Sequence, residues 1–236
     1  MDTSATRVVA RPLHVLPGAR LWLTPSLAGH TLAAAMFTIH PAAPTESGTV
    51  SELILQSDCG LLAALFGTTV KSLLSYLQAR PGNPYSSTNM LVVSDDDGSR
   101  FVIGALVGAL AAVTRRSNLR TAALLLAWYG PAVAARFPRL ARAGKALDDL
   151  RRDDFYLSHI AVLPEHRGRG AGRELLRSGE ERARQQGANR LVLDVEEHND
   201  RARSFYARLD YRPASLLRID LGRRGAFSFV RLFKDL

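Results

Sequence analysis

The sequence predicts an α+β fold, and three stretches support this prediction. Residues 155–163 form a short apolar run with β-branched and aromatic members, typical of a buried strand, and a glycine-rich loop and a helical pattern follow directly. Residues 90–107 contain two apolar runs on either side of an acidic turn, which predicts a β-hairpin. Residues 108–152 are dominated by Ala, Leu and Arg and predict helices. Strands and helices are therefore mixed along the chain.

Length and composition are those of a soluble globular protein. The chain has 236 residues, of which 47% are hydrophobic and 22% are charged, so it can bury one sizeable core. We expect residues 1–17 to be an N-terminal extension and residues 18–236 to form a single domain, with a helical insertion at about 108–152.

The chain is strongly basic, with a formal net charge of +9 and a sequence pI of about 10.4. The basic residues are nearly all Arg and are scattered, without the aromatic-and-basic strand motif of RNA-binding proteins, so nucleic acid is not an expected partner. Cys59 is the single cysteine, which excludes an intrachain disulfide and indicates a reducing, cytoplasmic setting. The apolar stretches 101–113 and 121–135 are short for a bilayer span, so we expect no membrane partner.

Turn-forming residues divide the N-terminal half into short elements. Pro25 and Ser26 predict a helix start, and residues 41–48 predict a loop from their Pro, Ser, Thr and Gly content. Residues 50–77 have helical periodicity interrupted near 57–59 and 67–68, which predicts two short helices. A firm turn at residues 81–84 then precedes the hairpin.

The C-terminal third also alternates between helix and strand. A helical pattern begins at Ala171 and is expected to end near Gly187, because glycine is a common helix C-cap. The following pattern predicts, in order, a strand at 190–196, a helix at 201–209 capped by Asn199-Asp200, and two strands of a closing hairpin at 211–220 and 225–233.

The loop Arg167-Gly168-Arg169-Gly170-Ala171-Gly172 joins the strand at 155–163 to the next helix. Glycines let the backbone approach a ligand closely, and N–H groups at a helix N-terminus carry partial positive charge, so such a loop suits a pyrophosphate. The loop lacks the Lys-Ser/Thr ending of a P-loop and the spacing of the dinucleotide-binding G-x-G-x-x-G fingerprint. It therefore indicates a phosphate-bearing cofactor of another kind.

These residues resemble the GNAT superfamily of acyl-CoA-dependent N-acetyltransferases. The family's central motif, Q/R-x-x-G-x-G/A after an apolar strand ending in V-x-P, is matched by residues 162–172. Its second block, a strand leading to an Asn and then a helix bearing a Tyr, is matched by Leu193-Asp194-Val195, Asn199 and Phe205-Tyr206. The resemblance spans Tyr156 to Tyr211. It implies a GNAT fold, with a mixed, mainly antiparallel central sheet splayed between two strands, helices on both faces and acetyl-CoA in the splay.

The resemblance also implies which residues bind the cofactor. Backbone groups of Ile160, Ala161 and Val162 would pair with the pantetheine arm, and one N–H there would polarise the thioester carbonyl. Asn199 would hydrogen-bond the pantetheine and could cap a helix at the same time. The pyrophosphate would be held by the backbone of Arg167, Gly168, Arg169, Gly170, Ala171 and Gly172, with Arg173 close by.

Three residues are candidates for catalysis. Tyr206 lies seven residues after Asn199 and matches the family's Tyr that protonates the leaving sulfur, although a core-facing aromatic is the alternative. Asp194 occupies the position where ribosomal-protein N-terminal acetyltransferases have a Glu base. Glu196 is the second candidate base, because it shares a strand face with Asp194.

Polar residues on the strand at 155–163 are candidates for the acceptor site. Strand alternation predicts that Tyr156, Ser158 and Ile160 share one face and that His159 lies on the other. Family members place acceptor-site groups at the positions of Tyr156 and Ser158, so these two are the substrate-binding candidates. For His159 a satisfied buried imidazole is favoured over a catalytic base.

The expected function is therefore transfer of an acetyl group from acetyl-CoA to a primary amine by direct attack in a ternary complex, without a metal. The alternative is a non-catalytic acyl-CoA-binding sensor or regulatory module. The sequence does not specify whether the acceptor is a small molecule or a peptide, and it is compatible with a homodimer.

Overall fold

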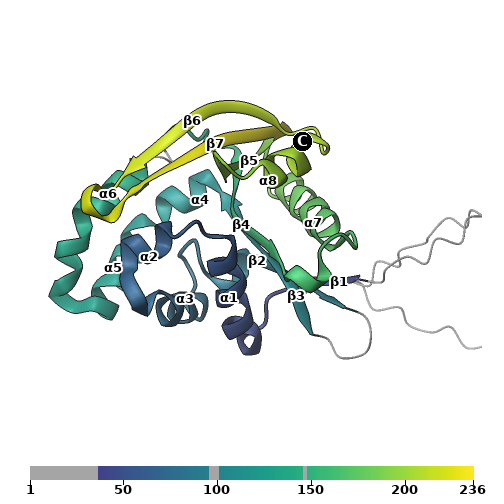
Figure 1. The fold of residues 1–236 in the computed structure, drawn as a ribbon. Coiled ribbons are helices and arrows are strands. Elements are labelled where there is room, and N and C mark those ends of the chain that lie inside the picture. The colour runs from purple at the N-terminus through teal and green to yellow at the C-terminus, as the bar shows by residue number, and fades with distance from the viewer. Residues whose placement is uncertain (1–36, 96–100, 146–147) are drawn as a thin grey trace, which may run out of the picture. The chain divides into compact units, whose positions relative to one another are not determined.

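The computed structural model describes residues 37–95, 101–145 and 148–236, so the expected N-terminal extension and the helix start at Pro25 lie outside the described residues. A seven-stranded sheet has the order β1-β2-β3-β4-β5-β7-β6 (Figure 1). All neighbouring strands are antiparallel except β4 and β5, which confirms the predicted mixed, mainly antiparallel α+β fold. The strands are β1 (Phe37–Pro41), β2 (Met90–Asp95), β3 (Val102–Leu110), β4 (Asp154–Val162), β5 (Arg190–Glu196), β6 (Arg212–Asp220) and β7 (Ala226–Asp235).

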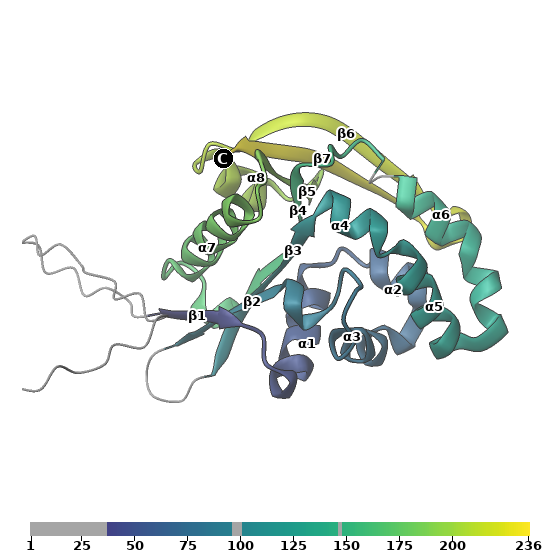
Figure 2. The ribbon, with the colours of Figure 1, turned by 180° about the vertical axis from the view of Figure 1, so that it is seen from behind.

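Helices cover both faces of the sheet (Figures 1 and 2). Helices α7 (Ala171–Gln185) and α8 (Asp200–Ala207) lie on one face, and α1 (Ser47–Ser57), α2 (Leu61–Phe66) and α3 (Val70–Gln78) lie on the other. The expected interruptions near 57–59 and 67–68 are present, but they divide the segment into three helices rather than two. Helix α1 also begins at Ser47, inside the segment predicted to be a loop, after a 3-10 turn at Pro44–Glu46.

The segment between β3 and β4 is helical, as its composition predicts. It contains α4 (Ala111–Arg116), α5 (Asn118–Tyr129), a 3-10 stretch at Gly130–Arg136, and α6 (Phe137–Lys145). We call residues 111–145 the helical arm. In the part of the chain that the structure describes, no single helix is both long and apolar enough to cross a membrane.

The main core lies between the sheet and α7. Leu106 on β3, Phe155 on β4 and Leu175 on α7 are fully buried there. Helix α7 approaches β3 closely at Gly179, where an added Cβ would stand 2.7 Å from the Leu106 side chain. Glu180, one residue on, joins α7 to the end of the chain: its carboxylate accepts from the Tyr211 hydroxyl at 3.0 Å and pairs with Lys234 at 2.9 Å.

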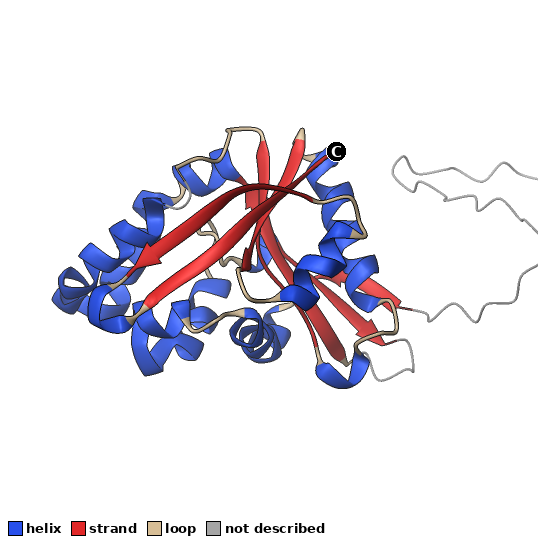
Figure 3. Cartoon of the chain, turned by 45° about the horizontal axis from the view of Figure 1, so that its top comes forward, coloured by secondary structure: helices blue, strands red, loops and turns tan. Residues whose placement is uncertain are grey.

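The sheet splays between β4 and β5, as expected for this fold. These two strands pair only between residues 154–157 and 190–193. Beyond Leu157 each strand continues without the other, β4 to Val162 and β5 to Glu196, and Figure 3 shows the strands fanning apart. A strand inside a sheet normally hydrogen-bonds to a neighbouring strand on each of its two edges. Because the pairing with β5 stops at Leu157, the last five residues of β4 have one edge without a strand partner.

A β-bulge at Ser158 corrects the alternation predicted for β4. Val107 of β3 lies opposite His159 and the next residue, Gly108, lies opposite Leu157, so Ser158 is an extra residue in the ladder. Ile160 therefore packs on the α7 face, whereas His159 and Tyr156 both lie on the face that carries α1 and α3. The prediction that Tyr156 shares a face with Ile160, opposite His159, is wrong.

Candidate functional site

The glycine loop forms a nest of N–H groups at the start of α7. Pro164 ends β4, and Gly168 and Gly170 then adopt φ of 80° and 98°, a left-handed conformation that L side chains rarely adopt. Gly170 is the N-cap of α7 and provides no side-chain cap. Among the described residues, the N–H groups of 168–172 donate to no protein acceptor. A Cβ at Gly168 or Gly170 would meet no atom within 4 Å, so the space above the loop is open.

Two arginines of the loop anchor it to the ends of neighbouring strands. Arg169 donates to Asp95 at the end of β2 at 3.0 Å, and its second contact, 3.1 Å, is with His166. Arg167 donates through Nε to the Val162 carbonyl at 2.8 Å. Arg173, in the first turn of α7, is exposed. The loop is therefore held from its sides while its N–H groups stay open to a ligand with several acceptor oxygens.

The open edge of β4 leads from this loop toward the centre of the sheet. The Leu163 N–H donates to Ile103 of β3 at 2.8 Å, so by alternation the Ala161 N–H also faces β3. The N–H groups of Ile160 and Val162 point the other way, into the gap left by β5. The backbone groups predicted to bind a pantetheine arm thus divide into two that face the gap and one, Ala161, that belongs to the β3–β4 ladder.

Asn199 caps α8 and Tyr206 lies on it, on the α7 side of the sheet. The Asn199 Oδ1 accepts from the Ala202 N–H at 3.0 Å, which confirms its capping role and leaves its amide nitrogen for another partner. The Tyr206 ring is buried against Phe205 and Tyr211, with centroids 5.2 Å and 5.5 Å away. Its hydroxyl donates to no acceptor among the described residues, and burial raises the pKa of this phenol, so it stays protonated.

Asp194 is held on the opposite face by two side chains. Its carboxylate makes a bidentate ion pair with Arg231 of β7, at 2.8 Å and 2.9 Å, and accepts from the Tyr156 hydroxyl at 3.0 Å. Burial, followed by the charge of Asp194, raises the pKa of Tyr156 well above its usual value. Glu196 lies on the same strand face, is exposed, and has no ion-pair partner in the described ranges. The structure therefore leaves Glu196, rather than Asp194, with a carboxylate open to solvent.

His159 is held between two hydroxyl groups. Its Nδ1 lies 3.1 Å from Ser57 Oγ at the end of α1, and its Nε2 lies 3.3 Å from the Tyr85 hydroxyl. Burial lowers the pKa of His159 to about 4, so the imidazole is neutral at pH 7. Ser158, the bulge residue, donates to the Val107 carbonyl at 3.3 Å.

Sequence reasoning missed three of these partners, namely Arg231, Ser57 and Tyr85. Ser57 and Tyr85 precede His159 by 102 and 74 residues, and nothing in their local sequence indicates the contact. Arg231 does carry a signal, because it interrupts the apolar strand Phe227 to Phe233, and a buried guanidinium requires a carboxylate partner.

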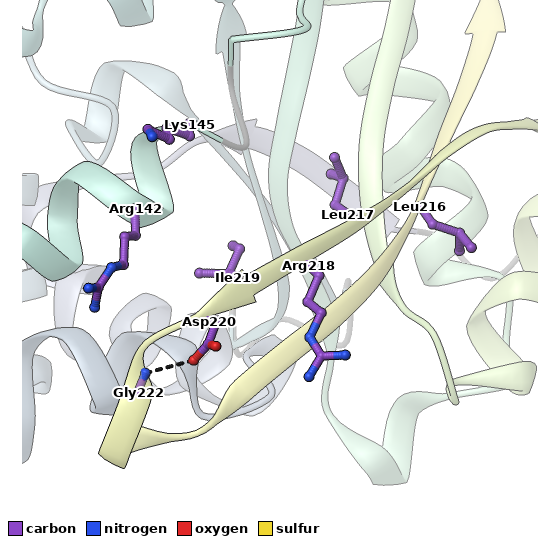
Figure 4. Close-up of a pocket in the computed structure, with 8 residues that line it drawn as sticks. All are labelled: Arg142, Lys145, Leu216, Leu217, Arg218, Ile219, Asp220 and Gly222. Carbon is purple, nitrogen blue, oxygen red and sulfur yellow. Dashed lines mark hydrogen bonds between the residues drawn. The ribbon is translucent and has the colours of Figure 1, made fainter.

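An open depression of about 470 Å³ lies elsewhere, between α6 and β6 (Figure 4). No residue predicted for the cofactor, the acceptor or catalysis lines it. Its lining is mainly basic and aliphatic: Arg142, Lys145, Leu216, Leu217, Arg218, Ile219, Asp220 and Gly222.

Known proteins resemble this chain in sequence and in fold. The sequence model described as the acetyltransferase (GNAT) family matches residues 84–211, more than half of the chain. YobR, an uncharacterized N-acetyltransferase of Bacillus subtilis (strain 168), is 42% identical over 59 residues, 25% of this chain and 24% of that protein. N-alpha-acetyltransferase 30 of Schizosaccharomyces pombe is 33% identical over 76 residues, 32% of this chain and 51% of that protein.

The chain thus spans about half or less of the length of these curated relatives. A crystal structure of an N-acetyltransferase from Staphylococcus aureus Mu50 matches it with a TM-score of 0.59 at 16% identity, over 84% of this chain and 100% of that one. At this identity the match shows a shared fold.

Proposed function

The chain belongs to the acetyltransferase (GNAT) family, and from this premise we propose that it transfers an acetyl group from acetyl-CoA to a primary amine by direct attack in a ternary complex. One observation carries the proposal. A row of N–H groups without protein acceptors, residues 168–172, lies at the N-terminus of α7, directly after the open edge of β4. Such a row matches a diphosphate, and the open strand edge matches the amide-bearing pantetheine arm that follows it.

The unpartnered N–H groups of the loop and the open edge of β4 support acetyl-CoA as the ligand. Bound acetyl-CoA supplies an acetyl group activated as a thioester. The N–H groups of Ile160 and Val162 bind the pantetheine arm, and one of them polarises the thioester carbonyl. The Asn199 amide nitrogen, which capping leaves free, donates to the same arm. Arg173 adds positive charge next to the diphosphate.

The reaction needs two proton transfers, and we assign them to residues on opposite faces of the sheet. Attack of the neutral amine on the thioester carbon forms the C–N bond and breaks the C–S bond. Tyr206, kept protonated by burial, gives its proton to the departing thiolate and regains one from solvent. The proton lost by the amine passes through water to Glu196. Asp194, with its carboxylate bound by Arg231 and Tyr156, holds the Tyr156 hydroxyl, a group of the acceptor site, in place rather than acting as the base itself.

The acceptor site lies where the α1–α2 connection approaches the end of β5. Burial raises the pKa of Cys59 to about 11, and the nearby negative charges of Asp58 and Glu196 add to this shift. Both carboxylates therefore lie close to Cys59. They favour an acceptor that arrives as an ammonium ion and loses its proton there. The name of the S. pombe relative, an N-alpha-acetyltransferase, supports peptide N-termini as the first acceptors to test.

A thiol-release assay tests the proposal. The chain is mixed with acetyl-CoA and a panel of amines that includes peptides with free and with blocked N-termini, and free thiol is measured over time. We expect release that requires both acetyl-CoA and a free primary amine. Binding of acetyl-CoA by calorimetry without thiol release for any amine would instead support the alternative, an acyl-CoA-binding sensor.

A further inference from the structure

Helix α5 is apolar on two sides but buried on only one. Its inner residues Leu125 and Trp128 pack against α3. On its outer side Leu119 is 86% exposed and Leu126, two turns further along, is 53% exposed. Its one charged residue, Arg120, donates through Nε to the Pro81 carbonyl at 2.6 Å. An apolar side of a helix is normally covered, but among the described residues no element covers the outer side of α5.

Exposed large apolar side chains are most frequent in the helical arm. Among the described residues six large hydrophobic side chains are exposed, and four of them belong to the helical arm: Val113, Leu119, Leu126 and Phe137. A fifth, Leu216, is 72% exposed and lines the depression between β6 and α6 (Figure 4). Leu119 and Leu126 lie two turns apart on one helix, and exposed apolar residues that share a helix side indicate an interaction surface.

The charge of the helical arm is of one sign. Residues 111–145 contain Arg115, Arg116, Arg120, Arg136, Arg139, Arg142 and Lys145, and no Asp or Glu. Partial burial and the neighbouring guanidinium groups of Arg224 and Arg136 lower the pKa of Arg139. Like charges are therefore close together near the turn between β6 and β7, where Arg224 lies. Within the described ranges, Arg136, Arg139 and Arg142 have no carboxylate partner.

We propose that the helical arm binds the surface of an anionic lipid membrane, with Leu119 and Leu126 entering the boundary between headgroups and acyl chains. An arm that carries only basic charges and an exposed apolar helix side matches anionic headgroups above hydrocarbon. A second copy of the chain is disfavoured, because it would bring a second wholly positive arm against the first. Nucleic acid would match the charge but would leave the aliphatic face uncovered.

Surface attachment of this kind differs from spanning a bilayer and goes beyond acetyl transfer. It would hold the transferase beside a membrane while the splay between β4 and β5 stays accessible, because none of the predicted site residues belongs to the helical arm.

Vesicle co-sedimentation of the full chain tests the proposal. Vesicles of phosphatidylcholine are compared with vesicles that also contain phosphatidylglycerol, at increasing salt. We expect binding to the anionic vesicles only, weakening as salt rises. The double variant Leu119→Ser/Leu126→Ser should lose about tenfold or more in vesicle affinity, because each buried methylene contributes to insertion.

Phe101→Ser is the matched control, since Phe101 is 53% exposed, as Leu126 is, but lies directly before β3, outside the arm. It should bind vesicles like the unmodified chain. Thermal melting and thiol release measured on the double variant should be unchanged, which separates this proposal from the acetyltransferase assignment.

Four results would overturn the membrane proposal. The first is equal sedimentation with neutral and anionic vesicles. The second is a double variant that binds anionic vesicles as the unmodified chain does. The third is a dimer, measured by light scattering, that is lost in the double variant, which would assign the face to a second copy. The fourth is tight RNA binding that is lost in the same variant, which would assign the face to nucleic acid.

Discussion

Replacing Gly170 with Glu places a carboxylate among the N–H groups that we assign to the diphosphate of acetyl-CoA. The new Cβ meets no atom within 4 Å, so the side chain points into open space and the core of the protein is untouched. Because φ at this position is 98°, the substitution costs about 1–2 kcal/mol of backbone strain. We therefore expect a slightly less stable but folded protein.

The loss of cofactor binding should be much larger than the loss of stability. Two unit negative charges about 4 Å apart repel by about 4 kcal/mol at an effective dielectric constant of about 20. Every 1.4 kcal/mol is about a tenfold change in affinity, so the Kd for coenzyme A should rise about a thousandfold. The neutral variant Gly170→Ala should lose far less, since it adds strain without charge.

Gly187 provides a matched control at the other end of the same helix. Its φ is 80°, its Cβ position is also open, and Gly187→Glu makes the same change in charge. Isothermal titration calorimetry with coenzyme A, with thermal melts alongside, compares the two variants. If Gly170→Glu bound coenzyme A within about threefold of Gly187→Glu, the diphosphate could not lie at this loop, and the reasoning would be refuted.

Three further predictions concern a proton donor, a partly buried ion pair and a half-buried imidazole. Tyr206→Phe should lower turnover about a hundredfold and leave the Kd for acetyl-CoA unchanged, and an unaltered turnover in steady-state kinetics would remove Tyr206 from the reaction. Glu180→Gln should lower the free energy of unfolding by about 2 kcal/mol in urea titrations, because Lys234 loses its buried counter-charge and Tyr211 its charged acceptor; a change below about 0.5 kcal/mol would contradict this. The folded pKa of His159 is about 4, below the value of 6.5 for the unfolded chain, so only the unfolded chain takes up a proton in this window and stability falls as pH drops from 6.5 to 4. His159→Gln should flatten this fall, by up to about 1.4 kcal/mol per pH unit, and urea titrations with the same pH slope in both proteins would contradict the prediction.

Local sequence patterns were sufficient for most of the fold. The strand at β5 and the hairpin of β2 and β3 follow directly from apolar runs and turn residues, and Gly187 and Asn199 mark helix ends where caps were expected. The α1 to α3 region was less well predicted, because each glycine-containing interruption ends one helix and starts another, so that two breaks leave three helices.

The candidate site was only partly predictable. The glycine loop has its own sequence signal, since its geometry depends on positive φ at Gly168 and Gly170. The surroundings of Asp194 and His159 depend on side chains that only the sheet register and the packing of α1 bring together. The alternation of side chains along a strand does not reveal that Ser158 is an extra residue. Ser158 and His159 are adjacent polar residues, and such a pair also occurs at ordinary strand ends.

The bulge at Ser158 lies directly after Leu157, the last residue of β4 that pairs with β5. Bulges bend a strand and increase its twist, so this single additional peptide unit is positioned to steer the far half of β4 away from its parallel neighbour. The splay between β4 and β5 would then arise from backbone geometry rather than from the size of the core side chains. Deleting Ser158 should allow β4 and β5 to pair beyond residue 157. The resulting protein should be well packed but should lack the open strand edge that the cofactor needs.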